Sequence, residues 1–456
     1  MRVISTRATH GAPAVSLSEA LAAGLAPDGG LYVPEAFPTL GPREREALDS
    51  STSLATVAQT ILSPFFRDDP LEDALPDLCA EAFSFPAPLV ELFDGAAPRS
   101  LEAGPGGGDP SPPQQALLEL FHGPTAAFKD YAARFLAGAL TRIPVQAGRH
   151  VLVATSGDTG AAVAAAFHGR PGFRVTVLYP EAGVSPRQAH LLGCFGDNVQ
   201  AFRVQGSFDD CQRLVKGALT DPGLRRRHGL TSANSISLGR LLPQMAYHAY
   251  AALGWKEMLG ARGSPGSGGA LPGFIIPSGN FGNALACLWA RDLGLPIGEV
   301  ILATNANRAL VDWLETGKAD PRPLRRTLAN AMDVGIPSNL ERLTWQHSAA
   351  PYGVSGISVS NHEIRATLAE APRRWGQVVC PHTSCGLRVL GDLRDGGDRR
   401  GWISVATAHP AKFPEVVEPE VGQAVPIPAA MAEWMERRSH AQPLKAEPRE
   451  LARVLD

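Results

Sequence analysis

Apolar and polar positions follow a repeating order along the middle of the chain. Apolar runs as long as a buried strand lie at 116–120, 151–155, 174–179, 199–204, 274–277 and 300–304. Segments with the apolar spacing of a helix follow them, at 128–136, 159–167, 186–194, 208–219, 284–292 and 309–314. Strands that alternate with helices form parallel sheets covered by helices on both faces. The pattern therefore predicts an α/β protein with doubly wound parallel sheets.

The two ends of the chain depart from this order. Residues 1–95 contain a Pro-Asp-Gly-Gly turn, a short strand that ends at Pro34 and helical spacing at 43–49 and 54–62, which predict a small α+β region. Two further strands are expected at 376–380 and 402–407, with turns at 332–342. From residue 414 onward we expect a polar, helical tail packed on the surface.

The length of 456 residues exceeds one ordinary hydrophobic core, so more than one domain is expected. We expect an N-terminal region at 1–95, an α/β domain at 96–260 and a second α/β domain at 261–456, the last two interleaved. Gly- and Pro-rich segments at 101–113 and 260–273 are expected to be loop insertions that leave the site intact.

Composition narrows the class of protein. Apolar residues make up 44% of the chain and charged residues 19%, and the net charge is -3, so nothing favours nucleic acid or an anionic membrane as a partner. No signal peptide pattern and no apolar run of about 20 residues occurs, which predicts a cytoplasmic protein. The six cysteines form no CxxC pair and the histidines have no HxxxH spacing, so neither disulfides nor a metal site is expected.

Lys129 is the first candidate for chemistry. It stands in FHGPTAAFKD (121–130), where a Gly-Pro break after a strand leads into a helix, and the chain has only six lysines among 42 basic residues. Unlike Arg, a desolvated Lys can lose its proton and form a Schiff base with a carbonyl. An ordinary solvent-facing lysine in the first turn of a helix remains the alternative.

Three polar segments lie at strand ends, where ligands of parallel sheets bind. TSGDTG (155–160) and PSGNFGN (277–283) each place glycines and small polar side chains at a helix start, which suits a phosphate or carboxylate. SANSISLGRLLPQ (232–244) adds Arg240, whose guanidinium can bind phosphate with two donors. A plain capped turn is the alternative reading of each segment.

Together with GLAPDGGLYVPE (24–35), MDVGIPSNLER (332–342) and ATAHPAKF (406–413), these segments resemble the threonine synthase family, in the same order along residues 1 to about 415. The likeness is to the longer bacterial and fungal type within the fold-type-II pyridoxal-phosphate enzymes. It implies two domains of the tryptophan-synthase-β-like type, plus the N-terminal region.

The resemblance also implies a role for each motif residue. Lys129 carries the Schiff base with pyridoxal 5'-phosphate, Asp158 lies beside the cofactor's 3-oxygen, and Thr407 faces its pyridine nitrogen. The cofactor phosphate is implied for Gly279, Asn280, Phe281, Gly282 and Asn283. The substrate carboxylate is implied for Ser156, Gly157 and Thr159, and the candidates for the substrate phosphate are Asn234 and Arg240.

The reaction implied is the conversion of O-phospho-L-homoserine and water to L-threonine and phosphate, by a monomer or homodimer. Another lyase of the same cofactor class, such as a serine/threonine dehydratase or a phospho-lyase, is the nearest rival. A dehydratase has no substrate phosphate to bind, so its activity should not depend on Arg240, whereas the activity on O-phospho-L-homoserine should. A binding protein that kept the fold without catalysis would carry no cofactor on Lys129.

Overall fold

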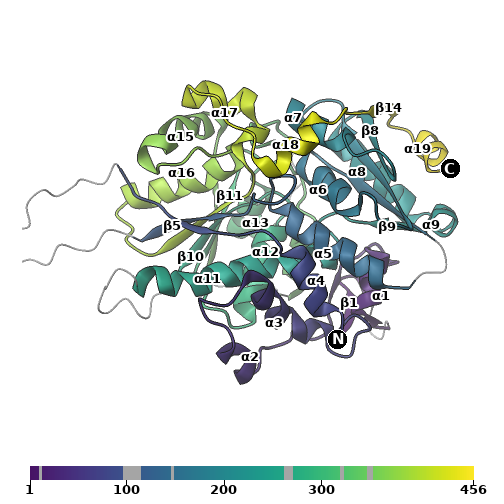
Figure 1. Cartoon of the computed structure of the whole chain (residues 1–456), viewed down its shortest axis with the longest axis horizontal. Coiled ribbons are helices and arrows are strands. Elements are labelled where there is room, and N and C mark those ends of the chain that lie inside the picture. The colour runs from purple at the N-terminus through teal and green to yellow at the C-terminus, as the bar shows by residue number, and fades with distance from the viewer. Residues whose placement is uncertain (10–12, 96–113, 145–147, 261–270, 319–322, 347–352) are drawn as a thin grey trace, which may run out of the picture.

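The computed structural model describes residues 1–9, 13–95, 114–144, 148–260, 271–318, 323–346 and 353–456. The larger of its sheets has the strand order β12-β11-β10-β13-β5-β4 (Figure 1). Its strands are β4 (Leu89–Glu91), β5 (Gln115–Glu119), β10 (Gly273–Pro277), β11 (Val300–Thr304), β12 (Val354–Ser358) and β13 (Trp402–Ala406). All neighbours are parallel except β4 and β5.

Helices cover both faces of this sheet because both sets of alternating strand positions are apolar. Phe274 and Ile276 of β10 pack into a core shared with α11 (Met245–Gly260) and α12 (Gly282–Asp292). Ile275, between them, faces a second core that includes α15 (Asn361–Arg374) and α16 (Pro381–Asp395).

The second sheet has the order β14-β8-β7-β6-β9 and is parallel throughout. Its strands are β6 (Arg149–Ala154), β7 (Phe173–Pro180), β8 (Val199–Gln205), β9 (Leu230–Ser232) and β14 (Ala441–Lys445). Val151 and Val153 face one core, while Leu152 packs with α8 (Phe208–Thr220) on the other side. Both sheets are thus doubly wound, and the predicted α/β fold class is confirmed.

One helix, α5 (Lys129–Arg142), joins the cores of the two sheets. Tyr131 and Phe135 on one side of it pack into the core under the six-stranded sheet, and Ala133 and Leu136 on the other side pack into the second core. The first residue of this helix is the candidate Lys129. The other helices around the second sheet are α6 (Asp158–Phe167), α7 (Pro186–Gly193), α9 (Pro222–His228), α18 (Ala429–Glu436) and α19 (Pro448–Leu455).

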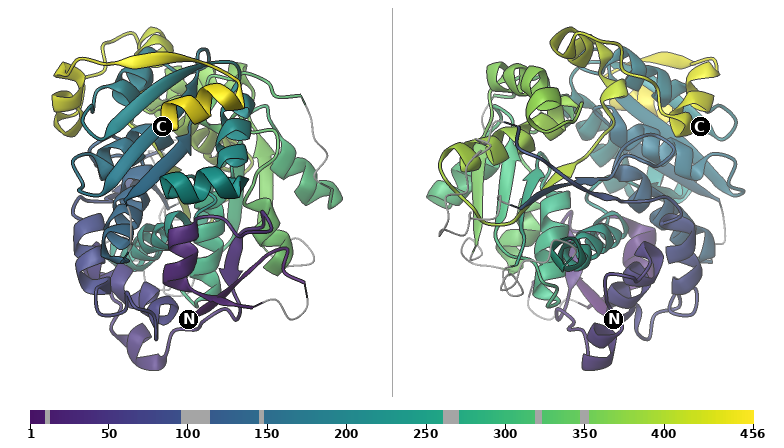
Figure 2. Two further views of the ribbon diagram at one scale, coloured as in Figure 1. Left: turned by 90° about the vertical axis from the view of Figure 1, so that its right-hand side faces the viewer. Right: turned by 60° about the vertical axis from the view of Figure 1, so that its left-hand side comes forward.

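The N-terminal region is a small α+β unit, as expected. Its antiparallel sheet has the order β2-β1-β3. Its elements are β1 (Arg2–Ser5), β2 (Val15–Ser16), α1 (Leu17–Ala23), β3 (Tyr32–Pro34), α2 (Pro42–Glu46), α3 (Leu54–Phe66) and α4 (Leu75–Ala82). Figure 2 shows this purple region at the end of the molecule opposite the yellow C-terminal elements.

Arg342 of α14 (Leu340–Gln346) connects the N-terminal region to the middle of the chain through hydrogen bonds. Its guanidinium is fully buried and donates to Tyr32 O at 3.0 Å, Ile236 O at 2.7 Å and Asn339 Oδ1 at 2.6 Å. These acceptors come from segments far apart in sequence, so one side chain holds them together.

Replacing Arg342 by Met is therefore expected to destabilise the fold. The substitution leaves buried acceptors without donors, each worth about 1–3 kcal/mol, and we expect unfolding free energy to fall by roughly 3 kcal/mol. Urea unfolding followed by tryptophan fluorescence measures the change. Arg449→Met, at an exposed position of α19, is the control; equal midpoints for the two variants would contradict this role.

Two expectations about elements were wrong. Residues 376–380 form no strand in the described chain: they are an extended lead into α16, which Cys380 caps by accepting from Thr383 N. The tail is not all helical, since it contributes β14, whose only buried residue is Leu444 and whose Pro443 suits an edge position. Strand β12 was not predicted, because all five of its residues are half-buried and its sequence shows no alternation of buried apolar and exposed polar positions.

The expected domain ranges 96–260 and 261–456 stay a prediction, but the sheets do not follow them. β4 and β5 belong to the sheet of β10–β13, and β14 returns from the C-terminal end to the sheet of β6–β9. The insertion at 101–113 lies outside the described residues, as does 261–270 of the second insertion. In the part of the chain that is described, no helix has the length and apolarity needed to span a bilayer.

Candidate active site

A cavity of about 680 Å³ opens where the two parallel sheets present the carboxyl ends of their strands. Lys129 follows β5 at this edge, Ser156 follows β6, Gly279 follows β10 and Thr407 follows β13, and all four line the cavity. The topology therefore brings together motifs that lie up to 278 residues apart in sequence.

Lys129 begins α5, and its side chain is mostly buried, with 14% of it exposed. Its Nζ lies 3.4 Å from Asp158 Oδ2. Burial lowers the pKa of Lys129; the attraction of Asp158 opposes this, and the positive charges of Lys412 and Arg240 add to the lowering. The environment thus favours an amine that can give up its proton, and the solvent-facing lysine is excluded.

Asp158 lies at the centre of a buried polar cluster. Its Oδ1 accepts from Gln188 Nε2 at 2.8 Å and lies 2.8 Å from Lys412 Nζ. Burial alone would raise the pKa of Asp158, but the charges of Lys412 and Lys129 hold it well below the usual range. The carboxylate of Asp158 is therefore ionised. Its neighbouring cations, in addition to its place at a helix start, explain why an aspartate is tolerated in this turn.

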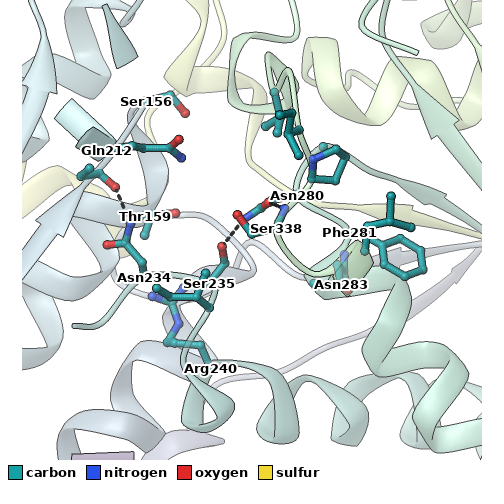
Figure 3. Close-up of a pocket in the computed structure, with 18 of the residues that line it drawn as sticks. Ser156, Thr159, Gln212, Asn234, Ser235, Arg240, Asn280, Phe281, Asn283 and Ser338 are labelled. Carbon is teal, nitrogen blue, oxygen red and sulfur yellow. Dashed lines mark hydrogen bonds between the residues drawn. The ribbon is translucent and has the colours of Figure 1, made fainter. Parts of the chain in front are cut away.

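The turn between β10 and α12 forms an anion cradle. Phe281 adopts a left-handed conformation with φ of +66°, which turns the backbone into the start of α12 at Gly282. A Cβ at Gly279 would stand 2.7 Å from Met332 Cα, so only glycine fits. Asn280 fixes the turn: it donates to Ser235 Oγ and accepts from Ser338 N at 2.6 Å (Figure 3).

Asn283 completes this cradle from the first turn of α12. Its Oδ1 accepts from Tyr247 Oη at 2.8 Å and lies 2.9 Å from His248 Nε2. Its Nδ2 is buried and has no partner among the described residues. A buried amide donor without an acceptor is costly, so this group marks a place for an anion.

Tyr247→Phe should therefore weaken the binding of an anion at this turn, because the orientation of Asn283 loses one of its hydrogen bonds. A lost neutral hydrogen bond costs about 1 kcal/mol, which corresponds to roughly a fivefold rise in Kd. Titration of the protein with pyridoxal phosphate, the phosphate compound that the family resemblance implies, measures it. Tyr250→Phe, on the same helix, is the matched control, and an unchanged Kd in Tyr247→Phe would contradict this role for Asn283.

The turn between β6 and α6 is held by Thr155, whose Oγ1 accepts from Gly157 N and Gly160 N, each at 2.9 Å. Gly157 has φ of +140°, and a Cβ there would clash with Gln188, so glycine is required. Ser156 and Thr159 line the cavity. Gly157 contributes backbone shape and is not part of the cavity wall that the structure describes.

Asn234 and Arg240 line the cavity on the same side as Thr159, across from Asn280 (Figure 3). Arg240 is 2% exposed and donates from Nη1 to Ala233 O at 2.7 Å, while its Nε has no partner among the described residues. Asn234 Nδ2 donates to Ala154 O at 3.2 Å, and its Oδ1 is also unpartnered there. Burial lowers the pKa of Arg240 to about 10, and the guanidinium keeps its charge at neutral pH.

Thr407 links the end of β13 to the segment that carries Lys129. Its carbonyl accepts from Phe128 N at 2.9 Å, and its own N–H donates to Thr383 Oγ1 at 3.3 Å. Thr407 therefore both lines the cavity and anchors the residue that precedes Lys129.

Several groups in the cavity wall or directly behind it were missed from sequence. Gln188 and Lys412 both contact Asp158, and His382 accepts from Ala331 N at 3.0 Å, with burial lowering its pKa to about 4. Gln188 and His382 carry no local signal. Lys412 did carry one: it is another of the six lysines in an arginine-rich chain.

The residues fit pyridoxal phosphate. A buried amine suits its aldehyde, and the glycine turn with the unpartnered Asn283 Nδ2 at a helix N-terminus suits its phosphate. The fold and the cavity thus define a pyridoxal-phosphate-dependent enzyme, and the family model described as "Pyridoxal-phosphate dependent enzyme" matches residues 116–410. Two further family models, "Threonine synthase N terminus" and "Threonine synthase, C-terminal", match residues 2–83 and 383–454. The chain belongs to the threonine synthase family.

Relatives along the whole chain agree with this assignment. A threonine synthase of Escherichia coli (strain K12) is 36% identical over 92% of this chain and 91% of its own length. The crystal structure of threonine synthase from Escherichia coli superposes with a TM-score of 0.85 at 33% identity, covering 100% of this chain and 99% of that one. A structure titled as pyridoxal-phosphate-bound threonine synthase from Brucella melitensis gives 0.82 at 32% identity, with 100% and 98% covered.

Proposed function

We propose that the chain converts O-phospho-L-homoserine and water to L-threonine and phosphate in this cavity, and that Lys129 is the residue bonded to the cofactor. The observation that carries the proposal is the buried amine of Lys129 between two glycine-rich turns at helix starts. Membership of the threonine synthase family supports the same substrate and reaction.

The backbone N–H groups of residues 279–283 and Asn283 Nδ2 would bind the cofactor phosphate. The dipole at the start of α12 favours a dianion there. Thr407, at the end of β13, would offer a neutral hydroxyl to the pyridine nitrogen. Asp158, near Lys129, would lie beside the 3-oxygen. When bound, pyridoxal phosphate supplies an electron sink for charge that develops on the substrate carbons.

The substrate lies between the two walls of the cavity. Ser156 and Thr159 offer hydroxyl and N–H donors to its carboxylate at the start of α6, and Gly157 shapes the turn that holds them. Arg240 and Asn234 receive its phosphate, and the unpartnered Nε of Arg240 supports this role. Both ends of the substrate are then fixed, and its reactive carbons lie near Lys129.

Lys129 then acts as the base. Its Nζ, once free of the cofactor, takes the proton from the substrate α-carbon, which is easier for an amine with a lowered pKa. Arg240 and the turn donors stabilise the phosphate as it leaves. Burial of the cluster around Asp158 keeps water away from the other side of the amine.

The test is to follow both products from phosphohomoserine. Phosphate release and threonine formation in equal amounts are expected. A preparation that releases phosphate without threonine, or that forms ammonia and a 2-oxo acid from threonine, would instead be one of the rival lyases. We propose only small molecules as partners. We also propose that the protein is cytoplasmic and is a monomer or homodimer, and gel filtration with light scattering measures this oligomeric state.

A further inference from the structure

Lys412 is a second lysine near the cavity, and it is buried against Asp158, the carboxylate that Lys129 also contacts. Lys412 Nζ lies 2.8 Å from Asp158 Oδ1 and donates to Thr125 O at 2.7 Å, and its side chain has 0% exposure. Lys129 Nζ lies 3.4 Å from the other oxygen, Oδ2. Two amines thus share one carboxylate, and the shorter contact belongs to the lysine that the proposed reaction does not use.

Lys412 is held in place by elements from both sheets. It ends the short helix η3 (Pro410–Lys412), directly after β13 of the larger sheet. Its carbonyl accepts from Ser185 Oγ at 2.7 Å, next to α7 of the smaller sheet. The amine therefore has one fixed position, at the Asp158 oxygen that Lys129 does not contact.

The other ionisable groups around the pair do not replace this charge. Burial lowers the pKa of His382 and of His409 to about 4, so both rings are neutral at pH 7. Burial raises the pKa of Asp130, whose oxygens accept from Thr125 N and Oγ1. Arg240 is a cation, but it lies on the substrate side of the cavity and acts on Lys129 more weakly than Lys412 does.

We propose that Lys412 is the counter-cation of Asp158 and that it leaves Lys129 free to be a neutral amine. The inference rests on the proposed role of Lys129 and adds a positioning residue to it. A buried carboxylate needs a positive partner. If Lys129 were its sole partner, the ion pair would hold Lys129 as an ammonium ion, which can neither attack an aldehyde nor accept a proton.

The test measures the pH at which Lys129 reacts as an amine. Full-length protein freed of cofactor is labelled with trace acetic anhydride across a pH series, and mass spectrometry of the Lys129 peptide gives the half-reaction pH. In Lys412→Met this pH should rise by about one to three units, the usual effect of one nearby charge. Lys445→Met, an exposed lysine on β14, should leave it unchanged.

A second variant separates charge from misfolding. In Lys412→Met with Asp158→Asn, both charges are gone and burial alone acts on Lys129, so the half-reaction pH should return to the original value or lower. An unfolded protein would titrate like free lysine in both variants, without this return. An unchanged pH in Lys412→Met, or no return in the double variant, would overturn the inference.

The holoenzyme gives a second readout. The visible absorbance band of bound cofactor should change its pH dependence in Lys412→Met, toward protonation at higher pH, while borohydride still fixes the cofactor to Lys129. If borohydride fixes no cofactor at Lys129 in the unaltered protein, the proposed function itself fails. If it does so and the pH dependence is the same in both proteins, only the role of Lys412 fails.

Discussion

Lys129→Ala is expected to lower the turnover of phosphohomoserine at least about a thousandfold. The substitution removes both the amine that bonds to the cofactor and the base for the α-proton, and a positioned base alone contributes about 10²–10⁴. Threonine formation measures the loss. Borohydride treatment followed by intact mass should add the cofactor's mass to the unaltered chain and nothing to the variant.

The control for this variant is Lys318→Ala, an exposed lysine after α13 (Ala309–Thr316), which should keep full activity and the borohydride adduct. Retention of the adduct in Lys129→Ala would assign the covalent bond to another amine. Lys412 would then be the nearest candidate, since it contacts the same carboxylate.

Arg240→Ala is expected to reduce kcat/KM for phosphohomoserine by about ten- to a hundredfold, mainly through KM. A hydrogen bond to a charged group is worth about 1.5–3 kcal/mol, and each 1.4 kcal/mol is tenfold. Competitive inhibition by inorganic phosphate should weaken in parallel, because the same guanidinium would bind it. Steady-state kinetics with and without phosphate measure both effects.

The matched control is Arg226→Ala, an exposed arginine of α9, for which neither constant should change. Because Arg240 also supports Ala233 O, the cofactor spectrum of the variant should be checked. A normal spectrum with unchanged KM and unchanged phosphate inhibition would remove Arg240 from the substrate site and favour a lyase whose substrate has no phosphate.

Apolar runs and helical spacing were enough to predict most of the two sheets. β6, β7, β8, β10 and β11 lie within a residue or two of the expected runs, because most of their residues are apolar and buried. The helix starts at Lys129 and Gly282 were also close, since Gly and Pro mark the preceding turns. Local composition carries this information, and no tertiary contact is needed to extract it.

Partners across the cavity could not be predicted in the same way. The contact between Lys412 and Asp158, or between Tyr247 and Asn283, joins segments whose approach is set by strand order. Strand order follows from pairing between β13 and β5, which are more than 280 residues apart in sequence. The edge strand β14 was missed for a related reason: its place depends on a neighbour and not on its own apolar content.

The position of β13 has a consequence for synthesis on the ribosome. This strand pairs with β10 on one side and β5 on the other, yet it is the last of the six to leave the exit tunnel. Until then β5 and β10 each present an open edge, the kind of surface that pairs with other chains. Thr407, whose carbonyl accepts the hydrogen bond from Phe128 N, directly follows β13 and leaves the tunnel just after it. The nascent polypeptide therefore cannot assemble its reactive centre until translation has passed Thr407.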